Sequence, residues 1–67
     1  MVFMQTAPMS KLSKWIVWTS DNTGEFVKAN KVIVGKRFIS FIEETETLEK
    51  TVKQYEIEKV QDYHIVE

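Results

Sequence analysis

The stretch FVKANKVIVGKRFISFIEE, residues 26–44, decides the fold that we predict for this chain. Within it, Val32–Val34 is a run of β-branched residues, which are stiff at χ1 and suit a pleated strand, and Phe38–Ile42 continues this chemistry. Gly35 and Lys36 lie between the two runs, and glycine at the first central position fits a type II′ turn. The stretch therefore predicts a β-hairpin against which the rest of the chain pairs or packs.

The pairing within this hairpin depends on the length of its turn. A two-residue turn at Gly35 and Lys36 pairs Ile33 with Phe38, whereas a three-residue turn pairs Val34 with Phe38, and the sequence leaves both registers open. In the first register both faces of the hairpin carry apolar residues. A ribbon of that kind is expected inside a closed barrel, a sandwich or an oligomer interface.

The segment Lys14–Thr19, with the sequence KWIVWT, predicts a strand that precedes the hairpin. Trp15 and Val17 alternate with Ile16 and Trp18, so each face of this strand carries a tryptophan. We expect both faces to be buried.

Turn formers connect this strand to the next one. The segment Ser20–Gly24 is dense in them and predicts a hairpin loop in which asparagine or glycine takes a positive φ. The second strand is expected from about Glu25 to Val34, and its polar middle, Lys28–Lys31, favours a bulge or a break. A third strand is expected over Arg37–Glu44.

The last third of the chain supports two interpretations. One is a helix over about 46–56, because that segment is rich in helix formers and has three apolar residues at helical spacing, Leu48, Val52 and Tyr55. The other is a strand at Thr51–Ile57, a short turn and a final strand at Val60–Val66. We favour the two strands, because the rest of the chain is β and the connections are short enough for a meander.

The predicted fold class is therefore all-β, a small five-stranded antiparallel meander or an SH3-like barrel, with an α+β fold as the alternative if 46–56 is a helix. In strand count, spacing and the short turn before the last strand, the pattern resembles SH3-like small barrels. Residues 14–67 are expected to form this single domain. Residues 1–13 are expected to be a loosely ordered arm, in which Val2, Phe3 and Met4 are candidates to add a strand to a sheet edge.

The composition limits how a domain of this size is stabilised. With only 67 residues, the chain exposes much of the surface that it must bury, so its stability is expected to be marginal. It has no cysteine and one histidine, which excludes disulfides and Cys/His zinc sites as supports. The remaining supports are a packed aromatic core and self-association.

The residues that carry chemistry argue against catalysis. The four serines lie in no nucleophile motif, and a single histidine cannot complete acyl-transfer machinery within one chain. His64 with Asp62 or Glu67 offers at most three metal ligands, two of them hard oxygens, so we predict no metal site. The two glycines form no phosphate-binding loop. We expect neither enzyme activity nor a cofactor.

The net charge of −1 conceals an asymmetry. Residues 1–42 carry six basic and two acidic side chains, whereas residues 43–67 carry three basic and eight acidic ones. No apolar run approaches the ~20 residues of a membrane span, and the N-terminus lacks the basic region of a secretory signal. We therefore expect a cytoplasmic protein that does not contact membranes.

These exclusions favour a small non-catalytic protein-interaction module that docks on a larger protein as an inhibitor, adaptor or assembly subunit. The acidic last third offers a surface for such docking, which could imitate the charge of nucleic acid. This predicted acidic face comprises Glu43, Glu44, Glu46, Glu49, Glu56, Glu58 and Asp62.

Two alternatives stay open. One is a nucleic-acid-binding small β-barrel that uses basic and aromatic side chains, although the net charge makes nucleic acid the less favoured partner. The other is a structural subunit that self-assembles through strand edges into a homo-oligomer. The predicted nucleic-acid-binding set comprises Lys14, Trp18, Lys28, Lys31, Lys36 and Arg37.

Overall fold

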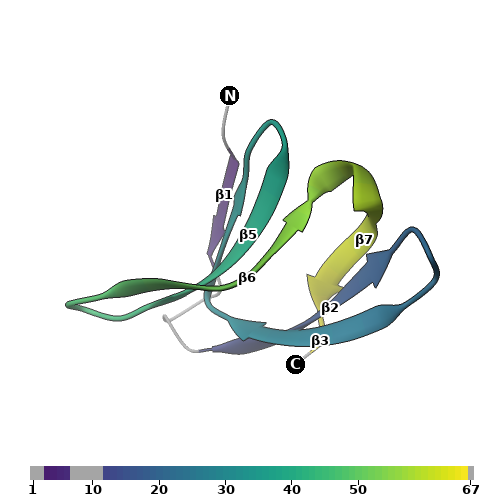
Figure 1. Ribbon diagram of the computed structural model, residues 1–67. Helices are drawn as coiled ribbons and strands as arrows, with labels where there is room; N and C mark the ends of the chain where they lie inside the picture. The colour runs from purple at the N-terminus through teal and green to yellow at the C-terminus, as the bar shows by residue number, and fades with distance from the viewer. Residues whose placement is uncertain (1–2, 7–11, 67) are drawn as a thin grey trace.

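The computed structural model describes residues 3–6 and 12–66 and contains strands that form two antiparallel sheets (Figure 1). One sheet has the order β1-β4-β5-β6 and the other has the order β3-β2-β7. The prediction of an all-β fold is confirmed. The elements are β1 Phe3–Thr6, β2 Ser13–Thr19, β3 Gly24–Ala29, β4 Lys31–Val34, β5 Phe38–Glu44, β6 Glu49–Glu56, the 3₁₀ turn η2 Ile57–Lys59, and β7 Val60–Ile65.

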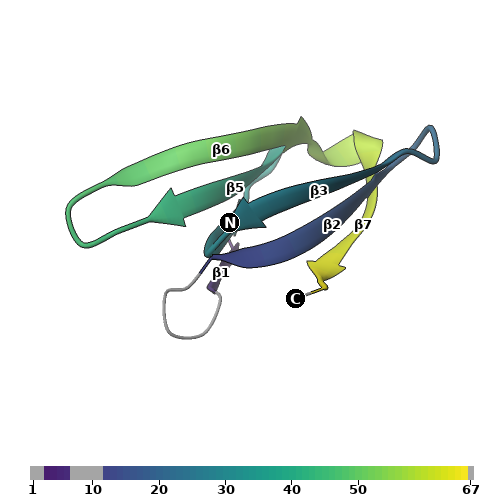
Figure 2. The ribbon, with the colours of Figure 1, turned by 90° about the horizontal axis from the view of Figure 1, so that it is seen from below.

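The core lies between the two sheets, which Figure 2 shows as two layers with β5 and β6 in one and β2 and β3 in the other. At its centre Phe41 is fully buried, and its ring meets those of Trp15 at 5.6 Å and of Tyr55 and Tyr63 at 6.0 Å, each edge to face. Such aromatic contacts stabilise a core beyond the area that they bury. The indole N–H of Trp15 donates to the Ala29 carbonyl at 3.1 Å, so its polar group is satisfied.

The central hairpin exists, but both predicted registers are wrong. Val34 pairs with Ile39 and Val32 with Phe41, and the Gly35 N–H donates to the Phe38 carbonyl at 2.8 Å. The turn is therefore centred further along the chain than predicted. No glycine in the described residues has a positive φ, so the predicted type II′ turn is also wrong. Packing decides the register here, because it places Val32 and Phe41 opposite each other with both fully buried.

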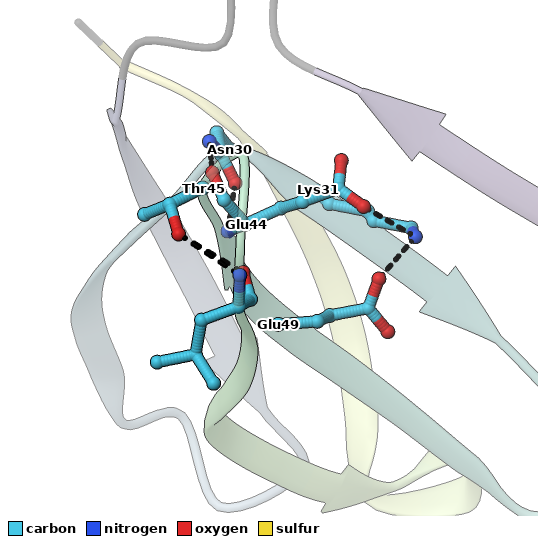
Figure 3. Close-up of polar contacts among 6 residues, drawn as sticks. Asn30, Lys31, Glu44, Thr45 and Glu49 are labelled. Atoms are coloured by element: carbon cyan, nitrogen blue, oxygen red, sulfur yellow. Dashed lines mark hydrogen bonds and ion pairs between the residues drawn. The ribbon is translucent and has the colours of Figure 1, made fainter.

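The single strand predicted over Glu25–Val34 is two strands, β3 and β4, which belong to different sheets. The predicted break in its polar middle is confirmed at Asn30, which is only 3% exposed. The Asn30 side chain donates to the Glu44 carbonyl and accepts from the Glu44 N–H, both at 2.8 Å (Figure 3). The Asn30 amide thus makes the two hydrogen bonds with Glu44 that the backbone of a neighbouring strand would otherwise make. It stabilises what we call the corner, the point at which the chain passes from β3 in one sheet to β4 in the other.

The helix considered for 46–56 is wrong, because β6 pairs with β5 over its whole length. Of the three residues at helical spacing, Leu48 and Val52 are exposed and only Tyr55 packs against the core. The charged residues between them occupy an edge strand, where charge opposes pairing with other chains. The short turn predicted before the last strand is the 3₁₀ turn η2.

Part of the predicted N-terminal arm forms a strand. β1 pairs with β4, with Phe3 opposite Val34, which raises the number of strands above the predicted five. At the other end of the predicted arm, Ser13 is the first residue of β2, and residues 1–2, including Val2, and 7–11 lie outside the described residues. In residues 3–6 and 12–66, no helix has the length and apolar character needed to cross a bilayer.

Candidate docking face

The strand β2 is buried on one face only, which corrects the prediction for KWIVWT. Trp15 and Val17 lie in the core, whereas Trp18 is 39% exposed. Because side chains alternate across a strand, Lys14, Ile16 and Trp18 point away from the core. The outward side of the sheet β3-β2-β7 is therefore an apolar surface facing solvent, which we call the outer face. Its members are Lys14, Ile16, Trp18, Gly24, Phe26, Lys28, Asp62, His64 and Val66, whose N–H donates to the Lys14 carbonyl.

Strand register arranges the outer face in rows that run across the three strands. Trp18 pairs with Gly24 on one side and with Asp62 on the other, and these three residues form the Trp18 end. Lys14 pairs with Lys28 on one side and lies next to Val66 on the other, and these three residues form the lysine end. The middle row between the two ends consists of Phe26, Ile16 and His64.

Trp18 lies flat against the neighbouring strand because Gly24 has no side chain. A Cβ atom added to Gly24 would lie 3.0 Å from both Cη2 and Cζ3 of the Trp18 ring. The sheet thus supports one side of the indole and leaves the rest exposed. A side chain held in place in this way loses little rotamer freedom when a partner covers it.

Phe26, which is 63% exposed, is the most open aromatic residue of the outer face. The Lys14 ammonium lies 4.4 Å from the centroid of its ring, a cation–π distance. Phe26 was missed from the sequence, although its signal was present. Pairing of β2 with β3 places Phe26 opposite Ile16, and hence on the face that also carries Trp18.

The two ends of the outer face carry opposite charges. At the Trp18 end, the Asp62 carboxylate lies 3.3 Å from Nδ1 of His64. At the lysine end, Lys14 and Lys28 oppose each other directly, which costs stability because like charges on paired residues repel. The face therefore has the apolar side chains of Ile16 and Phe26 next to His64 in the middle, lysines at one end and an aspartate at the other.

The structure divides the predicted acidic face among three places. Glu43, Glu44, Glu46 and Glu49 lie at the far tip of the β5–β6 hairpin, which projects from the body in Figure 1. Glu56 and Glu58 lie at the other end of β6, and eight residues of strand span about 23 Å. Asp62 lies on the outer face. The acidic residues are thus not brought together on one surface.

Two of these acidic residues, Glu44 and Glu49, form ion pairs next to the corner at Asn30. Lys31 Nζ lies 3.2 Å from the Glu44 carboxylate and 2.7 Å from that of Glu49 (Figure 3). Hydrogen bonds to Glu49 and then Glu44 raise the pKa of Lys31, and the bond to Lys31 lowers the pKa of Glu49. Lys31, a member of the predicted nucleic-acid-binding set, is therefore buried in a salt-bridge cluster away from the outer face.

The rest of the predicted nucleic-acid-binding set is split. Lys14, Trp18 and Lys28 share the outer face, whereas Lys36 and Arg37 lie at the β4–β5 turn. These two line a surface depression whose charges are mixed, because acidic residues from η2 and the end of β6 also border it. The depression is lined by Lys36, Arg37, Phe38, Glu56, Ile57 and Glu58.

A further polar contact joins the two sheets. The Tyr55 hydroxyl donates to a Glu25 carboxylate oxygen at 2.6 Å, and Lys53 Nζ lies 3.7 Å from the same atom. Burial, followed by the bond to Glu25, raises the pKa of Tyr55. The contact is a link between β3 and β6 that ties the two sheets together.

The described part of the chain contains no cluster of three or more His, Cys, Asp or Glu side chains that could hold a metal ion. Comparison of the chain with protein-family models, with curated proteins and with solved structures finds no match.

Proposed function

We propose that this protein is a non-catalytic interaction module that docks on a larger protein through its outer face. The observation that carries the proposal is the exposure of Trp18 and Phe26 on one sheet face, on either side of the half-buried Ile16. Aromatic residues surrounded by polar ones are typical of the energetic centre of protein interfaces. Single exposed apolar residues are common on any protein, but a contiguous group of them indicates a contact surface.

The construction of the face supports the proposal. The indole of Trp18 is already held against Gly24, so binding does not have to order it. Lys14, Lys28 and Asp62 surround the apolar middle, where charges select a partner and its orientation. Truncating a buried aromatic anchor of this type costs about 2 kcal/mol or more of binding free energy, which corresponds to at least a roughly thirtyfold loss of affinity.

The test is capture of a partner by the immobilised protein from a lysate of its source cells, treated with nuclease. Phe26→Ser removes one anchor, and Gly24→Ala pushes the Trp18 ring off its support without removing any side chain. The matched control is Phe38→Ser, because Phe38 is also an exposed aromatic at 44% but lies outside the outer face. We expect Phe26→Ser and Gly24→Ala to lose the partner and Phe38→Ser to keep it.

Circular dichroism and urea unfolding of each variant separate loss of docking from loss of folding. All three positions are exposed, so the variants are expected to fold. A partner that both outer-face variants retain, but Phe38→Ser loses, contradicts the proposal and assigns docking to the depression at the β4–β5 turn.

A second candidate function is binding of single-stranded nucleic acid, which a specific observation favours. Trp18 and Phe26 present exposed rings on the same face as Lys14 and Lys28, and bases stack on such rings while lysines contact phosphates. The net charge of −1 weakens this candidate.

Binding of labelled oligothymidylate and oligouridylate at low salt tests this candidate. If it holds, Lys14→Glu with Lys28→Glu abolishes binding, whereas Lys36→Glu with Arg37→Glu, the same change of charge away from the outer face, does not. Absence of binding by the wild-type protein at low salt eliminates the candidate.

A further inference from the structure

The outer face is complementary to itself. It carries two lysines at one end and an aspartate beside an exposed tryptophan at the other, and the row between them consists of Phe26, Ile16 and His64. A surface with opposite charges at its two ends fits a copy of itself that is turned end for end. A partner of a single charge can match only one of the two ends.

We infer that, when no larger partner is bound, a second copy of this chain covers the outer face in a two-fold symmetric, face-to-face dimer. The inference rests on the proposed function, because it assigns an occupant to the same docking face. A larger partner must then displace the second copy, so self-association regulates docking.

The three rows of the outer face determine how the second copy is oriented in the dimer. The two-fold axis lies in the interface, passes by Ile16 and runs across the strands, so the strands of the two sheets are close to antiparallel. This axis brings the lysine end of each copy against the Trp18 end of the other. Lys14 of one copy then lies beside Asp62 of the second copy, and its ammonium moves from the ring of Phe26 to this carboxylate when the dimer forms. The two middle rows meet each other.

Lys28 completes the contact. Its counterpart position in the second copy is Gly24, and the indole of Trp18 lies over that glycine. Lys28 of one copy therefore faces the exposed ring of Trp18 in the second copy, and tryptophan is the best cation–π acceptor among side chains. By symmetry, each dimer contains both contacts twice.

The monomer has a reason to associate. Only eight hydrophobic side chains are buried in the described residues, and the chain has no cysteine to add a disulfide. Domains of this size commonly rely on extra support, and oligomerisation is one such support. Covering Trp18 and Phe26 removes two large rings from water.

The size of the face predicts a weak dimer. Three strands spaced about 4.8 Å apart, with about five residues along each, give a contact of roughly 250 Å² per copy. Stable complexes bury about 800 Å² per partner. The expected dissociation constant is therefore on the order of 0.1–1 mM, which leaves the face open to a larger partner.

Sedimentation equilibrium from about 10 µM to 1 mM tests the dimer. We expect the average mass to rise from 7.9 kDa towards twice that value. Lys14→Glu sets a carboxylate beside Asp62 of the second copy, and Asp62→Lys sets an ammonium beside Lys14 of the second copy. Each variant alone therefore brings like charges together and is expected to stay monomeric.

The decisive sample is an equimolar mixture of Lys14→Glu and Asp62→Lys. In the mixed dimer, one of the two charged contacts joins the pair of exchanged charges and the other joins the original Lys14 and Asp62, so both are attractive again. We expect this mixture to associate about as tightly as the wild type. Lys36→Glu and Glu46→Lys make the same changes of charge away from the outer face and are expected to dimerise like the wild type. Circular dichroism confirms that every variant is folded.

Three results overturn the inference: a wild-type mass that stays at 7.9 kDa up to about 1 mM, a dimer that neither charge reversal weakens, or a mixture that stays monomeric. The second result indicates pairing through strand edges instead. The proposed function fails separately. It falls if Phe26→Ser and Gly24→Ala leave partner capture unchanged, and it survives a monomeric wild type if those variants lose the partner.

Discussion

Two pairs of like charges face each other directly across neighbouring strands, and the two pairs differ in the side chains that surround them. Glu44 opposes Glu49 across β5 and β6, and Lys31 lies between their carboxylates. Lys14 opposes Lys28 across β2 and β3 on the outer face, where Lys14 directs its ammonium over Phe26. The first pair is part of a structural corner, whereas the second keeps positive charge at a surface that faces solvent.

The bridged glutamate pair stabilises the fold, whereas the opposed lysine pair lowers its stability. Opposed like charges on a sheet are unfavourable, so a bridging cation converts the glutamate pair into a support for the fold. At the lysine end, Lys14 contacts the ring of Phe26, and the two opposed lysines concentrate positive charge on the proposed docking face. Natural proteins depart from locally favourable choices mainly at functional sites.

The largest effect is expected from breaking the corner itself. Asn30→Ala removes the amide that bonds both the N–H and the carbonyl of Glu44. Leaving these partly buried backbone groups without partners should lower the free energy of unfolding by about 2 kcal/mol. Urea unfolding measures the loss, and Asn22→Gly is the control, because Asn22 has a φ of 64° that glycine adopts without strain. A change below about 0.5 kcal/mol for Asn30→Ala contradicts the role assigned to the corner.

Because Lys31 bridges the two glutamates, we expect Lys31→Met to reverse the direction in which the stability of the protein changes in acid. In the wild type the pKa of Glu49 is lowered, so its stabilisation is present at neutral pH and is lost as the pH falls from roughly 5 to 3. The pKa of Lys31 is raised, so the bridge persists in alkali until the pH passes that raised value. Lys31→Met leaves the two glutamates repelling each other at neutral pH.

Thermal unfolding of Lys31→Met at neutral pH and in mild acid measures this effect. We expect the midpoint at neutral pH to fall by about 5 °C, and part of the loss to be recovered on acidification, where the wild type instead loses stability. Lys50→Met, at an exposed position of the same hairpin as Glu44 and Glu49, should leave the acid response of the wild type unchanged. The same response to acid in Lys31→Met and the wild type would rule out the bridge.

The elements of the fold were largely predictable because their signals are local. Alternation in KWIVWT, the turn formers before Gly24 and the β-branched run at Val32–Val34 depend on neighbours in sequence. The register of β4 with β5 was not predictable, because it is decided by Val32 and Phe41 meeting in the core. The division of β3 from β4 was anticipated as a break, but not as a passage between two sheets.

The sites were harder to predict because they combine strands that are distant in sequence. Lys14, Trp18 and Lys28 were selected by type and do share a face. Lys31 was selected by the same rule, yet its side chain turns to glutamates that lie 13 and 18 residues further along the chain. Only the pairing of β4, β5 and β6 reveals this contact, and net charge along the sequence gives no sign of it.

The smallest effect sharpens the comparison most, because stability and association are expected to move in opposite directions. Lys28→Thr removes one of the opposed lysines and introduces a residue that favours strands. The free energy of unfolding should therefore rise by about 0.5 kcal/mol, while dimerisation should weaken roughly threefold through loss of the contact with Trp18. Lys36→Thr, at the β4–β5 turn, is expected to change neither quantity. If Lys28→Thr destabilised the domain, the lysine end would be part of the structural support, and the contrast with the bridged glutamates would disappear.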